Sequence, residues 1–122
     1  MRVLIVESRK ELGTLWRNAL ARGGAEVWLA HGQNDAAGLI HRTEFDVIVL
    51  DVVLDEGSAL AVADLASYRQ PICRVVFVTD TTFFSDGTIF NYCANAAAYV
   101  PASTAPDDLA ALVEHHATVK RP

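Results

Sequence analysis

Three runs of apolar and mostly β-branched residues, none interrupted by a polar side chain, constrain this sequence more than any other feature. They are VLIV at residues 3–6, VIVL at 47–50 and VVFV at 75–78. Short unbroken apolar runs are typical of strands that are buried on both faces of a parallel sheet. A fourth run at 27–30 and a weaker one at 97–100 bring the number of predicted strands to five.

Segments with helical periodicity separate these runs. The first lies between the first two strands, where apolar residues from Leu12 to Leu20 recur three and four positions apart. Similar patterns predict helices over 33–42, 57–68 and 106–117, and a weaker pattern over 81–95 predicts a loop followed by a short helix. Strands that alternate with helices predict an α/β domain with a doubly wound, five-stranded parallel sheet.

Length and composition bound the class of protein. A chain of 122 residues predicts one domain. We assign it to residues 1–118, with 119–122 as a frayed end or the start of a linker. The net charge of −5 argues against direct nucleic-acid binding, which needs a basic face. No apolar run reaches the length of a signal peptide or a membrane span, and the two cysteines form no CxxC motif, so we expect a cytoplasmic protein that does not contact membranes.

Polar side chains follow the predicted strands at the carboxyl ends, where open parallel sheets bind ligands. Glu7 follows the first strand, Asp51 ends the third, and Thr79 and Asp80 follow the fourth. A single strand-end aspartate can equally be a helix cap, but several polar ends converging on one edge favour a functional site. Neither GxGxxG nor a P-loop motif is present, so a flavodoxin-like enzyme or cofactor binder is the least favoured class.

With these residues in place, the chain resembles the receiver domain of bacterial two-component response regulators. The resemblance rests on residues 1–7, on 45–51 ending in Asp51, on 75–79 ending in Thr79, and on Tyr99 in the fifth strand. It implies a flavodoxin-like (βα)5 fold with strand order 2-1-3-4-5. It also implies signalling rather than enzymatic turnover, because a receiver catalyses only its own phosphorylation and dephosphorylation.

The resemblance assigns roles to individual residues. Asp51 would accept a phosphoryl group from a histidine kinase or phosphotransfer protein. Glu7 and Asp51, with the backbone of Val53 as a weak ligand, would hold Mg²⁺. Thr79 and Tyr99 would be the switch residues that change the surface of the fourth and fifth helices. Positioning and charge neutralisation supply most of the catalysis in such a transfer.

The sequence departs from the receiver pattern at the charge-balancing positions. Ser8 stands where the second acid of an acidic pair is expected, and Ala102 stands where the resemblance places a lysine. Asp80 adds a negative charge beside Asp51, and Asp55 replaces a proline often found there. A serine hydroxyl is a poor Mg²⁺ ligand beside a carboxylate. The departures therefore predict a degenerate site that binds Mg²⁺ and phosphate weakly.

Two residues could compensate for these losses. Arg9 could reach the pocket and supply the missing positive charge, in which case a permanent salt bridge with Asp51 would lock the site. Asp80 could supply the missing metal ligand. The alternative that we favour from sequence for Arg9 and the adjacent Lys10 is that both are solvated residues in the first turn of a helix.

The sequence is compatible with two functions. The first is a receiver that accepts a phosphoryl group at Asp51 through an impaired site, and the alternative is a receiver-like module that recognises proteins without phosphorylation. In either case we expect the contact surface, including a homodimer contact, on the face of the fourth and fifth helices, where aromatic residues are concentrated. These residues are Phe83, Phe84, Phe90, Tyr92 and Tyr99.

Overall fold

The computed structural model of the chain describes residues 1–79 and 95–118. In this part of the chain, five parallel strands form one sheet with the order β2-β1-β3-β4-β5. The predicted strand order is confirmed. The strands are β1 (Arg2–Val6), β2 (Glu26–Ala30), β3 (Val47–Asp51), β4 (Arg74–Thr79) and β5 (Ala96–Pro101).

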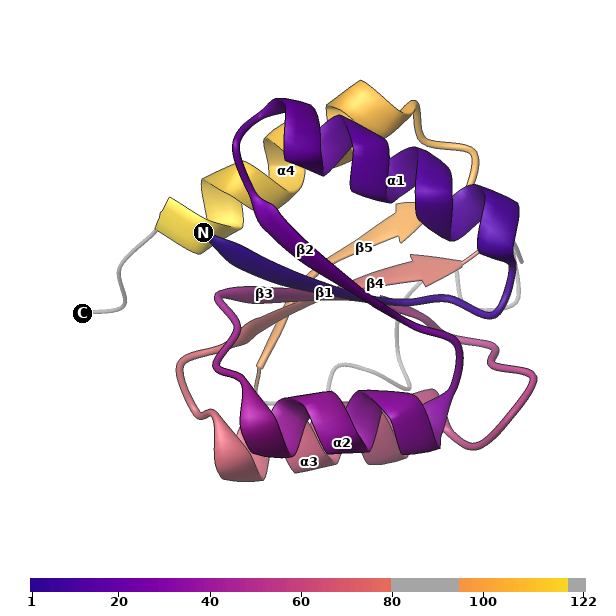
Figure 1. Cartoon of the computed structure of the whole chain (residues 1–122), viewed down its shortest axis with the longest axis vertical. Coiled ribbons are helices and arrows are strands. Elements are labelled where there is room, and N and C mark those ends of the chain that lie inside the picture. The colour runs from indigo at the N-terminus through magenta and orange to yellow at the C-terminus, as the bar shows by residue number, and fades with distance from the viewer. Residues whose placement is uncertain (80–94, 119–122) are drawn as a thin grey trace.

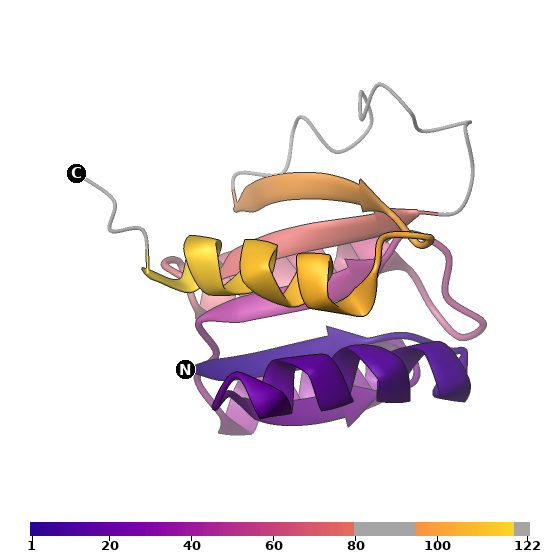
Figure 2. The ribbon, with the colours of Figure 1, turned by 90° about the horizontal axis from the view of Figure 1, so that it is seen from above.

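Helices cover both faces of this sheet (Figures 1 and 2). One layer holds α1 (Lys10–Arg22) and α4 (Pro106–Thr118), and the other holds α2 (Gln33–Arg42) and α3 (Ala59–Arg69). Because successive side chains of a strand point to opposite faces, each central strand contributes to two cores. In β3, Ile48 and Leu50 belong to the cluster under α2 and α3, whereas Val47 and Val49 pack toward α1 and α4. This two-sided burial is what the unbroken apolar runs predict.

The predicted helices agree closely with the observed ones. The helix predicted at 33–42 has these bounds, and the last helix is one residue longer than predicted. The helix predicted from residue 57 begins at Ala59, because Gly57 adopts a positive φ of 85° and Ser58 caps the helix by accepting a hydrogen bond from the Ala61 amide. The predicted segment at 81–95 and the terminal residues 119–122 lie outside the described residues, except for the buried Asn95.

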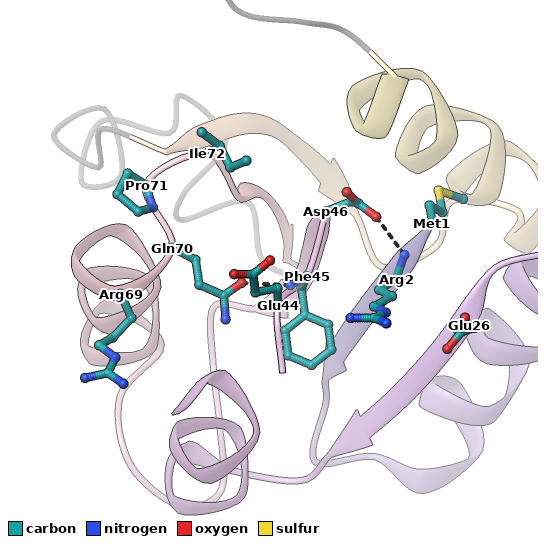
Figure 3. Close-up of a pocket in the computed structure, with 10 residues that line it drawn as sticks. All are labelled: Met1, Arg2, Glu26, Glu44, Phe45, Asp46, Arg69, Gln70, Pro71 and Ile72. Carbon is teal, nitrogen blue, oxygen red and sulfur yellow. Dashed lines mark hydrogen bonds between the residues drawn. The ribbon is translucent and has the colours of Figure 1, made fainter. Parts of the chain in front are cut away.

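At the amino edge of the sheet, the buried Gln70 side chain binds three backbone groups of the stretch 40–45. Its Oε1 accepts a hydrogen bond from the Phe45 amide at 2.7 Å, and its Nε2 donates to the carbonyls of Ile40 and Thr43 at 2.9 and 2.6 Å. Gln70 thereby fixes the end of α2 and the entry to β3. A hollow of about 470 Å³ lies beside it, lined by charges of both signs, at the opposite edge from Asp51 (Figure 3).

None of the helices within the described ranges is long and apolar enough to cross a membrane.

Gln70→Ala should lower the free energy of unfolding by about 2 kcal/mol, because the substitution leaves the Phe45 amide and two carbonyls without their partner. Denaturant unfolding measures the loss. The matched control is Arg69→Ala, which removes the neighbouring exposed side chain and should change stability by less than about 0.5 kcal/mol. Equal losses in both variants would contradict the role of Gln70.

Candidate functional site at the carboxyl edge of the sheet

Two buried carboxylates lie side by side at the carboxyl edge of the sheet. Val6 of β1 pairs with Leu50 of β3, so the residues that follow them, Glu7 and Asp51, occupy neighbouring positions. Glu7 is 2% exposed and Asp51 is 3% exposed. Burying two carboxylates together is costly unless a cation or a proton compensates for their charge.

Arg9 is the cation that joins them. Its Nη2 donates to Glu7 Oε1 and to Asp51 Oδ2, each at 2.9 Å, and its Nε donates to Glu7 Oε1 at 3.1 Å. The prediction that Arg9 is a solvated first-turn residue is therefore wrong. Arg9 directly precedes α1 in an extended conformation, with φ −83° and ψ 105°, and its side chain is only 46% exposed. Lys10, the first residue of the helix, is exposed as predicted.

The oxygen atoms of the two carboxylates have different partners. Asp51 Oδ2 is held by Arg9, and Asp51 Oδ1 accepts a hydrogen bond from the Val53 amide at 2.9 Å. Glu7 Oε1 is held twice by Arg9, whereas the buried Glu7 Oε2 has no hydrogen-bond partner in the described part of the chain. Both oxygens of Asp51 are thus occupied by donors of this chain.

Ser8 connects the loops around the site instead of facing the carboxylates. Its Oγ donates to the His31 carbonyl at 2.7 Å and accepts from the Asp55 amide at 2.9 Å. These bonds join the loops that follow β1, β2 and β3. The sequence identified Ser8 and Asp55 as departures from the receiver pattern, but nothing in the sequence showed that the two residues bind each other.

The pKa of Glu7 is raised from 4.5 to about 7, and burial is the largest cause. A hydrogen-bonding contact with Asp51 and the negative charge of Asp51 act in the same direction, while Arg9 lowers the pKa. For Arg9, burial opposes ionisation, but its bonds to the two carboxylates outweigh that effect and raise its pKa above the ordinary value. One guanidinium cannot neutralise two carboxylates, so the site retains a proton on Glu7 up to about neutral pH.

The donor set does not fit Mg²⁺. Mg²⁺ prefers several oxygen ligands in octahedral geometry. Here Arg9 and Val53 occupy both oxygens of Asp51, and Ser8 Oγ is engaged with two loops. No group of three or more His, Cys, Asp or Glu side chains within residues 1–79 and 95–118 is arranged to hold a metal ion. Of the side-chain oxygens of Glu7, Ser8 and Asp51, Glu7 Oε2 is the one left without a partner among the described residues, and one oxygen is too few for a magnesium site.

The residues expected to form the switch lie on the two strands at one edge of the sheet. Thr79 ends β4 and pairs with Pro101, and its carbonyl accepts a hydrogen bond from the Ala102 amide at 2.8 Å. Tyr99 of β5 stacks on Phe77 of β4, with ring centroids 5.4 Å apart, and is 36% exposed. Ala102 packs against the core beneath α1 and α4 and adds no charge.

Several predicted site residues cannot be placed. Asp80 and the aromatic residues Phe83, Phe84, Phe90 and Tyr92 lie outside the described residues. The compensating role of Asp80 and the aromatic contact surface therefore remain predictions.

Comparisons with known proteins identify the fold. No protein-family model matches the sequence, and no curated protein matches it. Among solved structures, the non-phosphorylated HemR receiver domain from Leptospira biflexa is 22% identical with a TM-score of 0.86, and the match covers 99% of this chain and 97% of that one. The N-terminal domain of a response regulator/sensory box/GGDEF protein from Carboxydothermus hydrogenoformans is 25% identical with a TM-score of 0.84, covering 96% and 94%.

A third neighbour is the response regulator TrrA from Thermotoga maritima, solved in complex with Mg²⁺ and BeF, with 21% identity, a TM-score of 0.81 and coverage of 94% and 97%. These neighbours are response regulators or their receiver domains, so the chain has the receiver-domain fold.

Glu7→Gln should stabilise the protein at pH 8 but not at pH 5. The folded pKa of about 7 exceeds the ordinary 4.5, so the folded state binds this proton more tightly. The contribution of Glu7 to stability therefore falls as the pH rises from about 4.5 to about 7. Glutamine does not ionise and so avoids this loss. We expect the free energy of unfolding of Glu7→Gln to exceed that of the wild type by an amount on the order of 2–3 kcal/mol at pH 8.

Denaturant unfolding at a series of pH values measures this difference. Glu11→Gln removes the same charge from the exposed surface of α1 and is the control, for which we expect no such pH dependence. A Glu7→Gln variant that loses stability relative to the wild type as the pH rises would show that the folded-state pKa of Glu7 lies below its ordinary value and would contradict this prediction.

Proposed function

We propose that this chain is a receiver-type module of two-component signalling that recognises a protein partner without being phosphorylated. The receiver fold and its neighbours support the signalling role. The proposal that the module is not phosphorylated rests on the contacts of Asp51. Its two oxygens are both bound by donors of this chain, and its side chain is almost fully buried.

Phosphoryl transfer to Asp51 would need a free carboxylate oxygen in line with the phosphorus atom and cations to offset the charge of the incoming group. Asp51 Oδ2 is bound to Arg9, and Ala102 brings no cation to the site. Among residues 1–79 and 95–118, the cation bound to Asp51 is Arg9, which is shared with Glu7. The geometry therefore favours a fixed site over a phosphorylation switch.

A second function is a receiver that still accepts a phosphoryl group at Asp51. The position of Asp51 at the end of β3, beside β4 with Thr79 at its end, favours it. In that case Arg9 would have to release Asp51 Oδ2, and a partially exposed arginine can turn toward an incoming phosphoryl group. Mg²⁺ and a histidine kinase or phosphotransfer protein would then belong to the reaction.

Incubation with Mg²⁺ and acetyl phosphate, followed by intact-mass measurement, tests between the two functions. We expect no added phosphoryl group, because Arg9 and the Val53 amide each bind an oxygen of Asp51 and Ala102 brings no cation to offset the incoming charge. Asp51→Asn is the matched control. A phosphoryl group gained by the wild type and absent from Asp51→Asn would establish the phosphorylated receiver.

Beryllofluoride provides a second test that does not depend on the phosphoryl donor, because it needs neither a donor nor a kinase to bind a carboxylate. We expect no change in the backbone NMR signals of Val53, Thr79 and Tyr99 when beryllofluoride and Mg²⁺ are added. Shifts at these three residues in the wild type, and none in Asp51→Asn, would contradict the proposed function.

A further inference from the structure

We propose that Arg9 is a built-in counter-ion that replaces a divalent cation between Glu7 and Asp51 and makes this site independent of metal. The inference concerns the charge balance of the site. Its test measures metal binding and not phosphorylation, so its failure can be told apart from a failure of the proposed function.

The position of the guanidinium carries the inference. Arg9 Nη2 lies 2.9 Å from an oxygen of Glu7 and 2.9 Å from an oxygen of Asp51, so a single nitrogen bridges the two carboxylates. The second contact, from Nε to Glu7 Oε1 at 3.1 Å, fixes the orientation of the planar group. A bridging metal ion would bind the same two oxygens, and it cannot do so while Arg9 holds them.

The chemistry of the two cations favours the arginine at this site. An arginine is always charged in proteins and its guanidinium is weakly hydrated. The dehydration of Mg²⁺ is unfavourable by comparison. To enter, Mg²⁺ would have to displace the charge-assisted contacts of Arg9 with Glu7 Oε1 and Asp51 Oδ2 and then find further ligands. The neighbouring Ser8 hydroxyl is bound to the His31 carbonyl and the Asp55 amide, so among the described residues it offers no third ligand.

The short connection makes the arginine hard to displace. Arg9 is separated from Glu7 by one residue, and its backbone is fixed by the start of α1, where the Gly13 amide donates to the Arg9 carbonyl at 3.0 Å. A tethered group of this kind has a high effective concentration at its partner, which an ion in solution must exceed to compete.

The test compares metal binding by the wild type and by Arg9→Ala. Mn²⁺ is added to each protein, and paramagnetic broadening of backbone NMR signals reports binding near Val53 and Asp51. Mg²⁺ is then titrated while the thermal unfolding midpoint is followed, with NaCl at equal ionic strength as the salt control. Arg17→Ala is the matched variant, because it removes an exposed arginine of α1 and gives the same net charge.

In the wild type and in Arg17→Ala we expect no local broadening and no stabilisation by Mg²⁺ beyond that of NaCl. In Arg9→Ala the two carboxylates lose their cation. We therefore expect Mn²⁺ broadening at Val53, an affinity for Mg²⁺ at least roughly tenfold higher than that of the wild type, and an unfolding midpoint that rises with Mg²⁺.

Two results would overturn the inference. One is local Mn²⁺ broadening at Val53 in the wild type, which shows that Arg9 does not exclude the metal. The other is a folded Arg9→Ala that remains as insensitive to Mg²⁺ as Arg17→Ala. Should Arg9→Ala fail to fold even with Mg²⁺, Arg9→Gln takes its place, since its amide can still donate to one carboxylate, and the same two outcomes decide.

Discussion

The burial of the central strands on both faces is the constraint on which the rest of this structure depends. A strand that packs under helices on each side has no position for a polar side chain along its length, and β1 and β3 are almost completely apolar between their ends. Polar groups are therefore confined to the places where the strands end. Because the strands are parallel and in register, Glu7 and Asp51 come to lie next to each other at one edge. The fold creates the pair of carboxylates before any function is considered.

Such a pair needs compensation, and the chain supplies it from the two residues that follow Glu7. Arg9 provides a positive charge to both carboxylates, and Ser8 fixes the loops that surround them. Both carboxylates are buried, so removal of the arginine would leave their negative charge uncompensated and would destabilise this arrangement. The compensation is incomplete, because one positive charge faces two negative ones. Burial, together with the neighbouring Asp51, therefore keeps the pKa of Glu7 raised.

Much of the fold, and the composition of the site, follow from the sequence, because both depend on local patterns. The unbroken run at 47–50 predicts a strand buried on two faces, and the aspartate after it predicts a polar strand end. The contact of Arg9 could not be predicted in the same way. Periodicity places residue 9 at the start of a helix, where arginines are usually solvated. Whether it turns inward depends on the extended backbone at that residue and on an unbalanced charge from a strand 42 positions later. The pairing of Ser8 with Asp55 depends equally on how the loops meet.

A tethered cation changes what can control this site. The occupancy of a metal site varies with the concentration of the ion, whereas the guanidinium of Arg9 is present at every concentration and at every ordinary pH. The charge at Asp51 is then constant unless something acts on Arg9 itself, whose side chain remains partly exposed while both of its partners are buried. A partner protein that offers a carboxylate or phosphate to Arg9 would compete for the one charge that stabilises Glu7 and Asp51. Contact between Arg9 and a partner protein, instead of phosphorylation of Asp51, would then control this receiver fold.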